Sequence, residues 1–114
     1  MVTPFDAAGH VDYAALEALT DWFIDAGVAG LFACCLSSEM YDLTPSERLG
    51  IAKCVFRRTA GRVKVVATGT FGGSVEEMAT FSREMSEFCD AIVIVSAFFA
   101  AEDDPPETWL NNCR

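Results

Sequence analysis

The stretch "GLFACCLSSEMYDLTPSERL" (Gly30–Leu49) decides the fold. An unbroken apolar run over residues 31–36 is followed at once by two hydroxyls and a carboxylate, at Ser37, Ser38 and Glu39. Apolar residues on both faces are typical of a parallel strand that is covered on both sides. The stretch therefore predicts a buried strand, a polar loop at its carboxyl end and a helix after the loop.

The same alternation runs through the rest of the chain. Strands are expected over 2–5, 30–36, 62–69 and 91–97, and helices over 12–27, 44–58 and 74–89. Strands that alternate with helices form right-handed βαβ units around a parallel sheet. Hydrophobic periodicity leaves two architectures open at this length: a small doubly wound sheet, or half of an eight-stranded barrel.

Capping signals mark where the helices begin. Thr44 stands at an N-cap, Pro45 occupies the first helical position and Glu47 closes a capping box. The other expected helix starts are Asp12 as an N-cap, Ser74 boxed with Glu77, and Asp104 before a short final helix.

Composition limits the kinds of protein and partner that fit this chain. The chain has 114 residues, 52% of them hydrophobic, and a mean hydropathy of +0.27, which is apolar for one small domain. This predicts a core that is shared with more protein. A net charge of −9 disfavours nucleic acid and anionic membrane as partners. There is no apolar run of about 20 residues and no signal segment, so we expect a cytoplasmic protein.

The five cysteines are Cys34, Cys35, Cys54, Cys89 and Cys113. No pair has the CxxC spacing of a metal site or redox couple, so we interpret them as small packing residues in a reducing compartment. Neither a metal nor a cofactor is predicted.

Function in a parallel α/β fold belongs at the carboxyl ends of the strands. Ser37 lies at such an end, but the only histidine is His10 and no GxSxG elbow surrounds the serine, which argues against a hydrolase. An anion cradle formed by Ser37 and neighbouring amides is favoured instead.

Two further loops have simpler explanations. The glycine-rich residues 69–74 match neither dinucleotide nor P-loop patterns, and a tight turn before a helix explains them as well as a phosphate site does. The acidic run 102–104 is interpreted as a solvated loop. The only lysines, Lys53 and Lys64, fall on a helix and at the amino end of a strand, away from any such site.

Five spaced motifs resemble the amino-terminal half of the dihydrodipicolinate synthase and N-acetylneuraminate lyase family. They are "VTPF" (2–5), "GLFACCLSSE" (30–39), "LTPSER" (43–48), "VVATGTFGGSVEEM" (65–78) and "CDAIVIVSAFF" (89–99). The family typically shows a TPF element, a GTTGE-like loop, an L-[ST]-x-x-E-R helix start, a V-x-x-G-T-G strand and a PYY sequence. The resemblance covers essentially the whole chain, in order.

The resemblance implies a (β/α)8 barrel that forms a lysine Schiff base with pyruvate. In the family the GTTGE loop binds the pyruvate carboxylate, so Leu36, Ser37 and Ser38 are implied to contact substrate here. Ser37 keeps the hydroxyl of the second threonine. Leu36 replaces the first threonine, and Phe99 replaces the last tyrosine of PYY, so two members of the family's proton relay lack their hydroxyl. Phe99 is also implied to lie at the substrate site.

Length departs most from the family pattern, since a barrel of this class takes about 250 residues. The Schiff-base lysine belongs to a later strand, so no catalytic residue is expected here. We therefore predict one partial domain over 1–114: the first half of a barrel with four parallel strands, inactive alone, whose ligand is pyruvate or another 2-keto acid.

Two alternatives stay open. One is a non-catalytic half-barrel module that forms a homo-oligomer or pairs with a complementary half barrel. The other is a small flavodoxin- or response-regulator-like domain, which is disfavoured because a strand-end phosphoacceptor and a phosphate loop after the first strand are missing.

Overall fold

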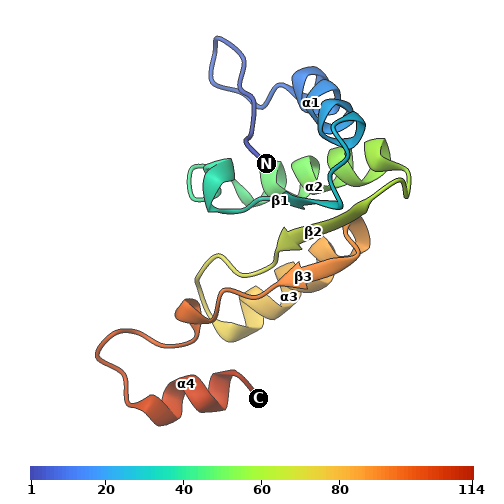
Figure 1. Cartoon of the computed structure of the whole chain (residues 1–114). Helices are drawn as coiled ribbons and strands as arrows, with labels where there is room; N and C mark the ends of the chain where they lie inside the picture. Colours follow the sequence, from blue (N-terminus) through green and yellow to red (C-terminus); the bar gives the residue numbers. More distant parts are fainter.

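The computed structural model describes residues 1–114 as a three-stranded parallel sheet with helices (Figure 1). The strands, in the order β1-β2-β3, are β1 (Gly30–Ala33), β2 (Lys64–Thr68) and β3 (Ala91–Val93). The helices are α1 (Tyr13–Asp25), α2 (Pro45–Thr59), α3 (Val75–Met85) and α4 (Pro106–Asn112). Short 3₁₀ turns occupy Leu36–Ser38, Ser86–Phe88 and Ser96–Phe99.

The core lies between one face of the sheet and the helices. Leu31 of β1 and Val65 of β2 are buried against Ile51 and Val55 of α2, and all four belong to one apolar cluster. α1 packs on α2, outside the sheet. The β-α-β-α-β order places both crossover helices on the same side. The opposite face, which includes Phe32, is only half-buried, as in a sheet cut from a barrel.

The predicted first strand, residues 2–5, is not a strand in the structure. Phe5 forms only an isolated antiparallel bridge with Val11, and Pro4 has no N–H to donate to a ladder. The segment still lies beside β1, because the amino group of Met1 donates to the carbonyl of Phe32 at 2.9 Å. The sheet therefore has three strands, and the prediction of four is not confirmed.

The outer strands are also shorter than predicted. β1 ends at Ala33 because Cys34 adopts a left-handed backbone with φ of +52°. β3 ends at Val93, and the chain then turns into the 3₁₀ segment Ser96–Phe99. Apolar composition continues past both ends, but Leu36 and Ile94 there are 70% and 48% exposed, so apolar character alone does not mark where a strand ends.

Three of the four capping predictions are confirmed. The Asp12 carboxylate accepts from the Ala15 N–H at 2.9 Å. Thr44 with Glu47, and Ser74 with Glu77, form reciprocal boxes. The prediction that Asp104 starts the last helix is wrong, since Pro105 holds the N-cap position of α4 and the Asp104 carboxylate accepts from the Ala101 N–H at 2.8 Å.

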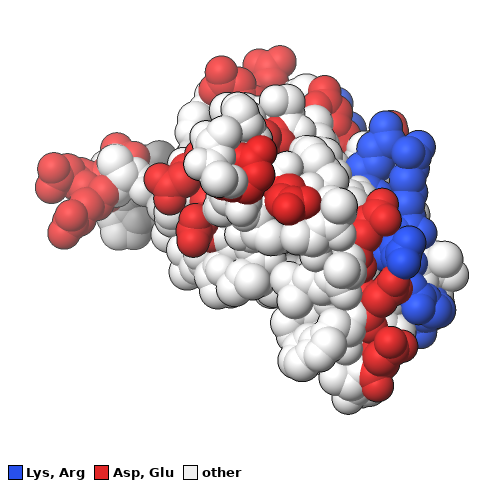
Figure 2. Space-filling view, turned by 90° about the horizontal axis from the view of Figure 1, so that it is seen from above, with Lys and Arg blue, Asp and Glu red and all other residues white.

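Charged side chains gather along one edge of the molecule. Figure 2 shows Lys and Arg side chains grouped there beside acidic ones, while Asp and Glu are spread over the rest of that view. Arg58 on α2, and Arg62 in the segment after it, bind the two carboxylate oxygens of Asp21 on α1. These ion pairs join α1 to α2. No helix has the length and apolar character needed to cross a membrane.

The capping box at the start of α2 gives the first test. Thr44→Ala removes the hydroxyl that accepts from the Glu47 N–H, and should lower the free energy of unfolding by about 1 kcal/mol in a urea melt. Thr44→Ser retains a hydroxyl and should remain near wild type. An unchanged urea midpoint for Thr44→Ala would contradict this role.

The second test concerns pH. Hydrogen bonds from Arg58 and Arg62 lower the pKa of Asp21 to about 2, against about 3.9 in an unfolded chain. The carboxylate therefore stabilises the fold above about pH 4, and this stabilisation is lost as pH falls toward 2. Between pH 5 and pH 2 the urea midpoint should fall less in Asp21→Asn than in wild type. Asp25→Asn, on the same helix without an ion pair, should behave as wild type.

Candidate functional site

The loop after β1 is held in shape by its own hydrogen bonds. The Cys35 N–H donates to the Ser38 hydroxyl at 3.1 Å, and that hydroxyl donates to the Met1 carbonyl at 2.5 Å. Thr3 donates its hydroxyl to the Ser38 carbonyl at 2.9 Å. The amino-terminal segment that contains Met1 and Thr3, and that lies beside β1, thus holds the loop in place.

Two backbone amides of this loop are free. The N–H groups of Leu36 and Ser37 donate to no acceptor in the chain, because they open a 3₁₀ turn and have no preceding carbonyl in reach. Both side chains are exposed, and Leu36 is 70% exposed. Two adjacent free amides and a serine hydroxyl can donate to the oxygens of a carboxylate or a similar anion.

A pocket of about 360 Å³ opens beside this loop, on the sheet face that the helices leave uncovered. It collects residues from the carboxyl ends of all three strands. Its lining is Phe32, Cys35, Leu36, Ser37, Met40, Thr68, Val93 and Val95. No charged side chain is among them. We call it the strand-end pocket.

The structure brings together only part of the predicted substrate site. Leu36 and Ser37 line the strand-end pocket. Ser38 is buried at 1% exposure, with its hydroxyl engaged by the loop itself. Phe99 lines a different pocket beside Gly72, because β3 ends early and the chain turns away. Val95, rather than Phe99, lines the strand-end pocket together with Ser37. Contact of Ser38 or Phe99 with a substrate stays a prediction.

Cys35 and Thr68 are pocket residues that the sequence interpretation missed. The Cys35 sulfur lies 3.0 Å from the Ser37 hydroxyl and 3.2 Å from that of Ser38. Partial burial opposes ionisation of the thiol, but these hydroxyls and the amino group of Met1 outweigh it and lower the pKa of Cys35 to about 7. Two serines within three residues of a strand-end cysteine were the available signal.

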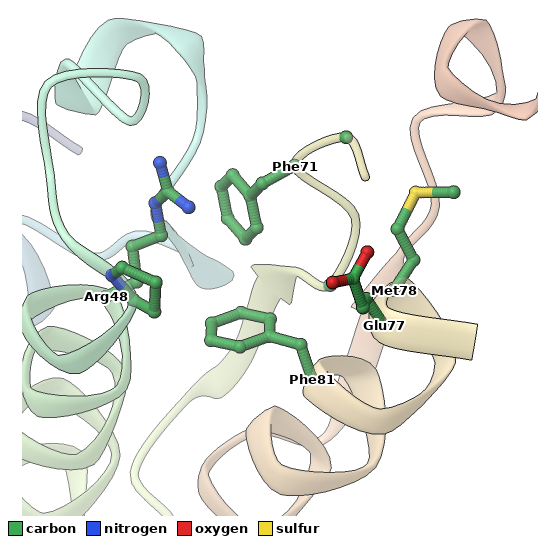
Figure 3. Close-up of a pocket in the computed structure, with 8 residues that line it drawn as sticks. Arg48, Phe71, Glu77, Met78 and Phe81 are labelled. Carbon is green, nitrogen blue, oxygen red and sulfur yellow. The ribbon is translucent and has the colours of Figure 1, made fainter. Parts of the chain in front are cut away.

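Another pocket lies between α2 and α3 (Figure 3), and it shares no lining residue with the strand-end pocket. In the figure the rings of Phe71 and Phe81 lie between Arg48 and Glu77. The Arg48 guanidinium stacks 4.0 Å from the centre of the Phe71 ring and donates through Nε to the Met40 carbonyl at 2.9 Å. Arg48 thereby holds the far end of the β1 loop.

Neither lysine reaches the strand-end pocket. Lys53 lies on α2, with its Nζ 5.5 Å from the centre of the Phe88 ring. Lys64 begins β2, at the opposite end of the sheet, and its Nζ binds Asp90 at 2.7 Å. The pocket therefore offers hydroxyls, amides and a thiol, but no amine from a lysine.

Comparison with known proteins identifies the family of the chain. The model of the dihydrodipicolinate synthetase family matches residues 1–105. The 4-hydroxy-tetrahydrodipicolinate synthase of Laribacter hongkongensis is 37% identical over 84 residues, which are 74% of this chain and 28% of that protein. The crystal structure of dihydrodipicolinate synthase from Aquifex aeolicus matches with a TM-score of 0.83 and 28% identity, over 98% of this chain and 37% of that one.

A third relative was solved with a small molecule. YagE, a prophage protein of E. coli from the dihydrodipicolinic acid synthase family, was crystallised in complex with pyruvate. It is 32% identical, with a TM-score of 0.75 over 82% of this chain and 31% of YagE.

These matches favour part of a barrel over a small doubly wound sheet, because nearly the whole of this chain superimposes on a synthase barrel. The chain spans about a third of the length of the relatives it matches. It belongs to the dihydrodipicolinate synthetase family.

Proposed function

We propose that this chain is the carboxylate-binding part of a pyruvate-dependent lyase of the family, and that it binds a 2-keto acid without converting it. The observation that carries the proposal is the pair of free amides at Leu36 and Ser37, next to the Ser37 hydroxyl. They lie in the loop that occupies the place of the family's GTTGE motif. The complex of YagE with pyruvate supports the choice of ligand.

The surroundings of the loop favour a carboxylate despite the acidity of the chain. Although the net charge is −9, no Asp or Glu lines the strand-end pocket. Its wall is mainly apolar, formed by residues such as Phe32, Val93 and Val95. A carboxylate could accept from the amides at the rim while the rest of a small keto acid lies against this wall.

Catalysis by this chain alone would lack its nucleophile. A Schiff base needs a neutral amine beside the substrate carbonyl, and Lys53 and Lys64 both lie away from the strand-end pocket. Leu36 and Phe99 also lack the hydroxyls of the family's proton relay. We therefore propose that aldol chemistry requires the later strands of a complete barrel.

The uncovered sheet face favours a second candidate function, assembly. Phe32 and Val66 are half-buried on this face, and Leu36 and Ile94 near it are 70% and 48% exposed. In a closed barrel such residues would be covered by the remaining strands. A second copy, or a complementary half barrel, would cover them in the same way.

Pyruvate binding can be measured by thermal unfolding. At about ten times its Kd, pyruvate should stabilise the chain by roughly 1.4 kcal/mol and raise its Tm by several degrees. Ser37→Ala should reduce this shift, because a donor to the carboxylate is lost. Ser86→Ala, at the end of α3, should respond as wild type, and sodium chloride at equal ionic strength should not reproduce the shift. The same Tm with and without pyruvate would refute the ligand.

Assembly can be measured by analytical ultracentrifugation. If the uncovered face drives pairing, the chain should sediment as a dimer at micromolar concentration. Phe32→Lys, which places a charge on that face, should dissociate it. Phe56→Lys, a similar change on the helical side, should leave the dimer intact. A wild-type monomer across the concentration range would rule out self-pairing.

A further inference from the structure

We propose that Cys35 is a reactive thiol, which is alkylated by small uncharged carbonyl electrophiles of the enone or maleimide class that enter the strand-end pocket. Alkylation at this site does not require that the loop bind a carboxylate, although both proposals use the Ser37 hydroxyl. It rests on the environment of the sulfur, on an unpartnered hydroxyl in the same pocket, and on the contrast with the other four cysteines.

The sulfur of Cys35 has a hydrogen-bond donor that is free to support a thiolate. The Ser38 hydroxyl, 3.2 Å away, directs its single hydrogen to the Met1 carbonyl. The Ser37 hydroxyl, 3.0 Å from the sulfur, has no other partner in the chain and can donate to it. A hydrogen bond to a charged acceptor is stronger than one to a neutral acceptor, so Ser37 favours the ionised form. The lowered pKa of Cys35, about 7, agrees with this arrangement.

Thr68 supplies the second, independent feature of the site. It is 1% exposed, lines the strand-end pocket together with Cys35, and its hydroxyl forms no hydrogen bond within the chain. The hydroxyl itself keeps some accessible surface, since Thr59 is the residue whose hydroxyl is both fully buried and unpaired, and the Thr68 hydroxyl is free to donate into the pocket that Thr68 lines. A ligand with a carbonyl oxygen could accept from it. The apolar wall of the pocket favours a ligand that is otherwise uncharged.

The other cysteines lack this combination of access and support. Cys34 is buried, and burial raises its pKa to about 12. Cys89 is buried, and its thiol donates to the Met85 carbonyl. Burial likewise raises the pKa of Cys54. Cys113 is exposed and has no hydrogen-bond partner for its thiol, which makes it an internal reference for an accessible thiol without such contacts.

The reaction is a conjugate addition that needs no oxidant. The thiol proton goes to solvent, and the sulfur electron pair forms an S–C bond to the β-carbon of the electrophile. The C=C π electrons move toward the carbonyl and leave an enolate, whose oxygen accepts a hydrogen bond from Thr68. Water then gives a proton to the α-carbon, and the product is a thioether.

The test labels the 114-residue chain with a limiting amount of N-ethylmaleimide and measures each cysteine by peptide mass spectrometry. At pH 7 a thiol of pKa near 7 is about half ionised, whereas a thiol of unperturbed pKa is about 3% ionised. The thiolate of lower pKa is also less basic and therefore less nucleophilic, which offsets part of the advantage in thiolate concentration. Cys35 should therefore react about three- to fourfold faster than Cys113, and this preference should vanish in denaturant. Equal rates in the native chain, or a preference that survives denaturation, would overturn the proposal.

Variants separate the two hydroxyls. Ser37→Ala should slow labelling of Cys35 by any electrophile, relative to Cys113 in the same sample. Thr68→Val should slow the reaction with N-ethylmaleimide about fivefold, the effect of one hydrogen bond. It should not slow the reaction with methyl methanethiosulfonate, which has no carbonyl. Thr68→Ser should restore the maleimide rate. If Thr68→Val slows the reactions with both reagents equally, the proposed role of Thr68 is overturned. If Ser37→Ala leaves the labelling rate of Cys35 unchanged, the proposed role of Ser37 is overturned.

Pyruvate gives a readout that keeps the two proposals apart. Protection of Cys35 from labelling by pyruvate, but not by sodium chloride, would support the carboxylate cradle. Fast labelling without such protection would count against the cradle alone and still support the reactive thiol. Slow labelling of Cys35 together with a pyruvate-dependent rise in Tm would count against the reactive thiol and support the carboxylate cradle.

Discussion

The packing of α2 against β1 and β2 is the interaction on which the rest of the structure depends. Ala52 and Val55 have no exposed surface, and they meet the buried residues Ala33 and Val65 of the two strands. Gly30 allows these strands to lie close, since a Cβ there would come within 2.9 Å of the Lys64 carbonyl. Because α2 covers one face of the sheet, the carboxyl ends of the strands are accessible from the opposite face. The loop after β1 lies at these strand ends, beside the strand-end pocket.

That loop owes its shape to one backbone feature. Cys34 turns the chain out of β1 with a positive φ, and Glu39 closes the following turn with another, at +56°. Between them the peptide N–H groups of Leu36 and Ser37 are left without acceptors, while the Cys35 sulfur lies beside two hydroxyls. The amides and the thiol are therefore products of the same turn, although they serve different chemistry. Arg48 and the segment around Thr3 hold this turn from its two sides.

Sequence patterns predicted helices better than strands, for a physical reason. Helix starts such as Thr44–Glu47 are local, because the residues that cap the helix are its own neighbours. Strand ends depend on partners elsewhere: the segment 2–5 has the apolar character of a strand but pairs with almost nothing. The position of Ser37 in the loop after β1 was predictable, because the change from apolar to polar residues at this point is local in the sequence. Thr68 was not, because its proximity to Cys35 arises only when β1 and β2 align.

The last helix bears on how the chain would appear in amide hydrogen exchange. α4 lies apart from the sheet (Figure 1), attached chiefly to the 3₁₀ turn before it, where Trp109 donates to the Ser96 carbonyl at 2.9 Å and Asn112 to that of Phe99 at 2.7 Å. None of its residues is buried. A segment with so few contacts opens without the rest. We therefore expect two tiers of protection: slow amides in β1, β2 and α2, and fast ones from the end of β3 onward.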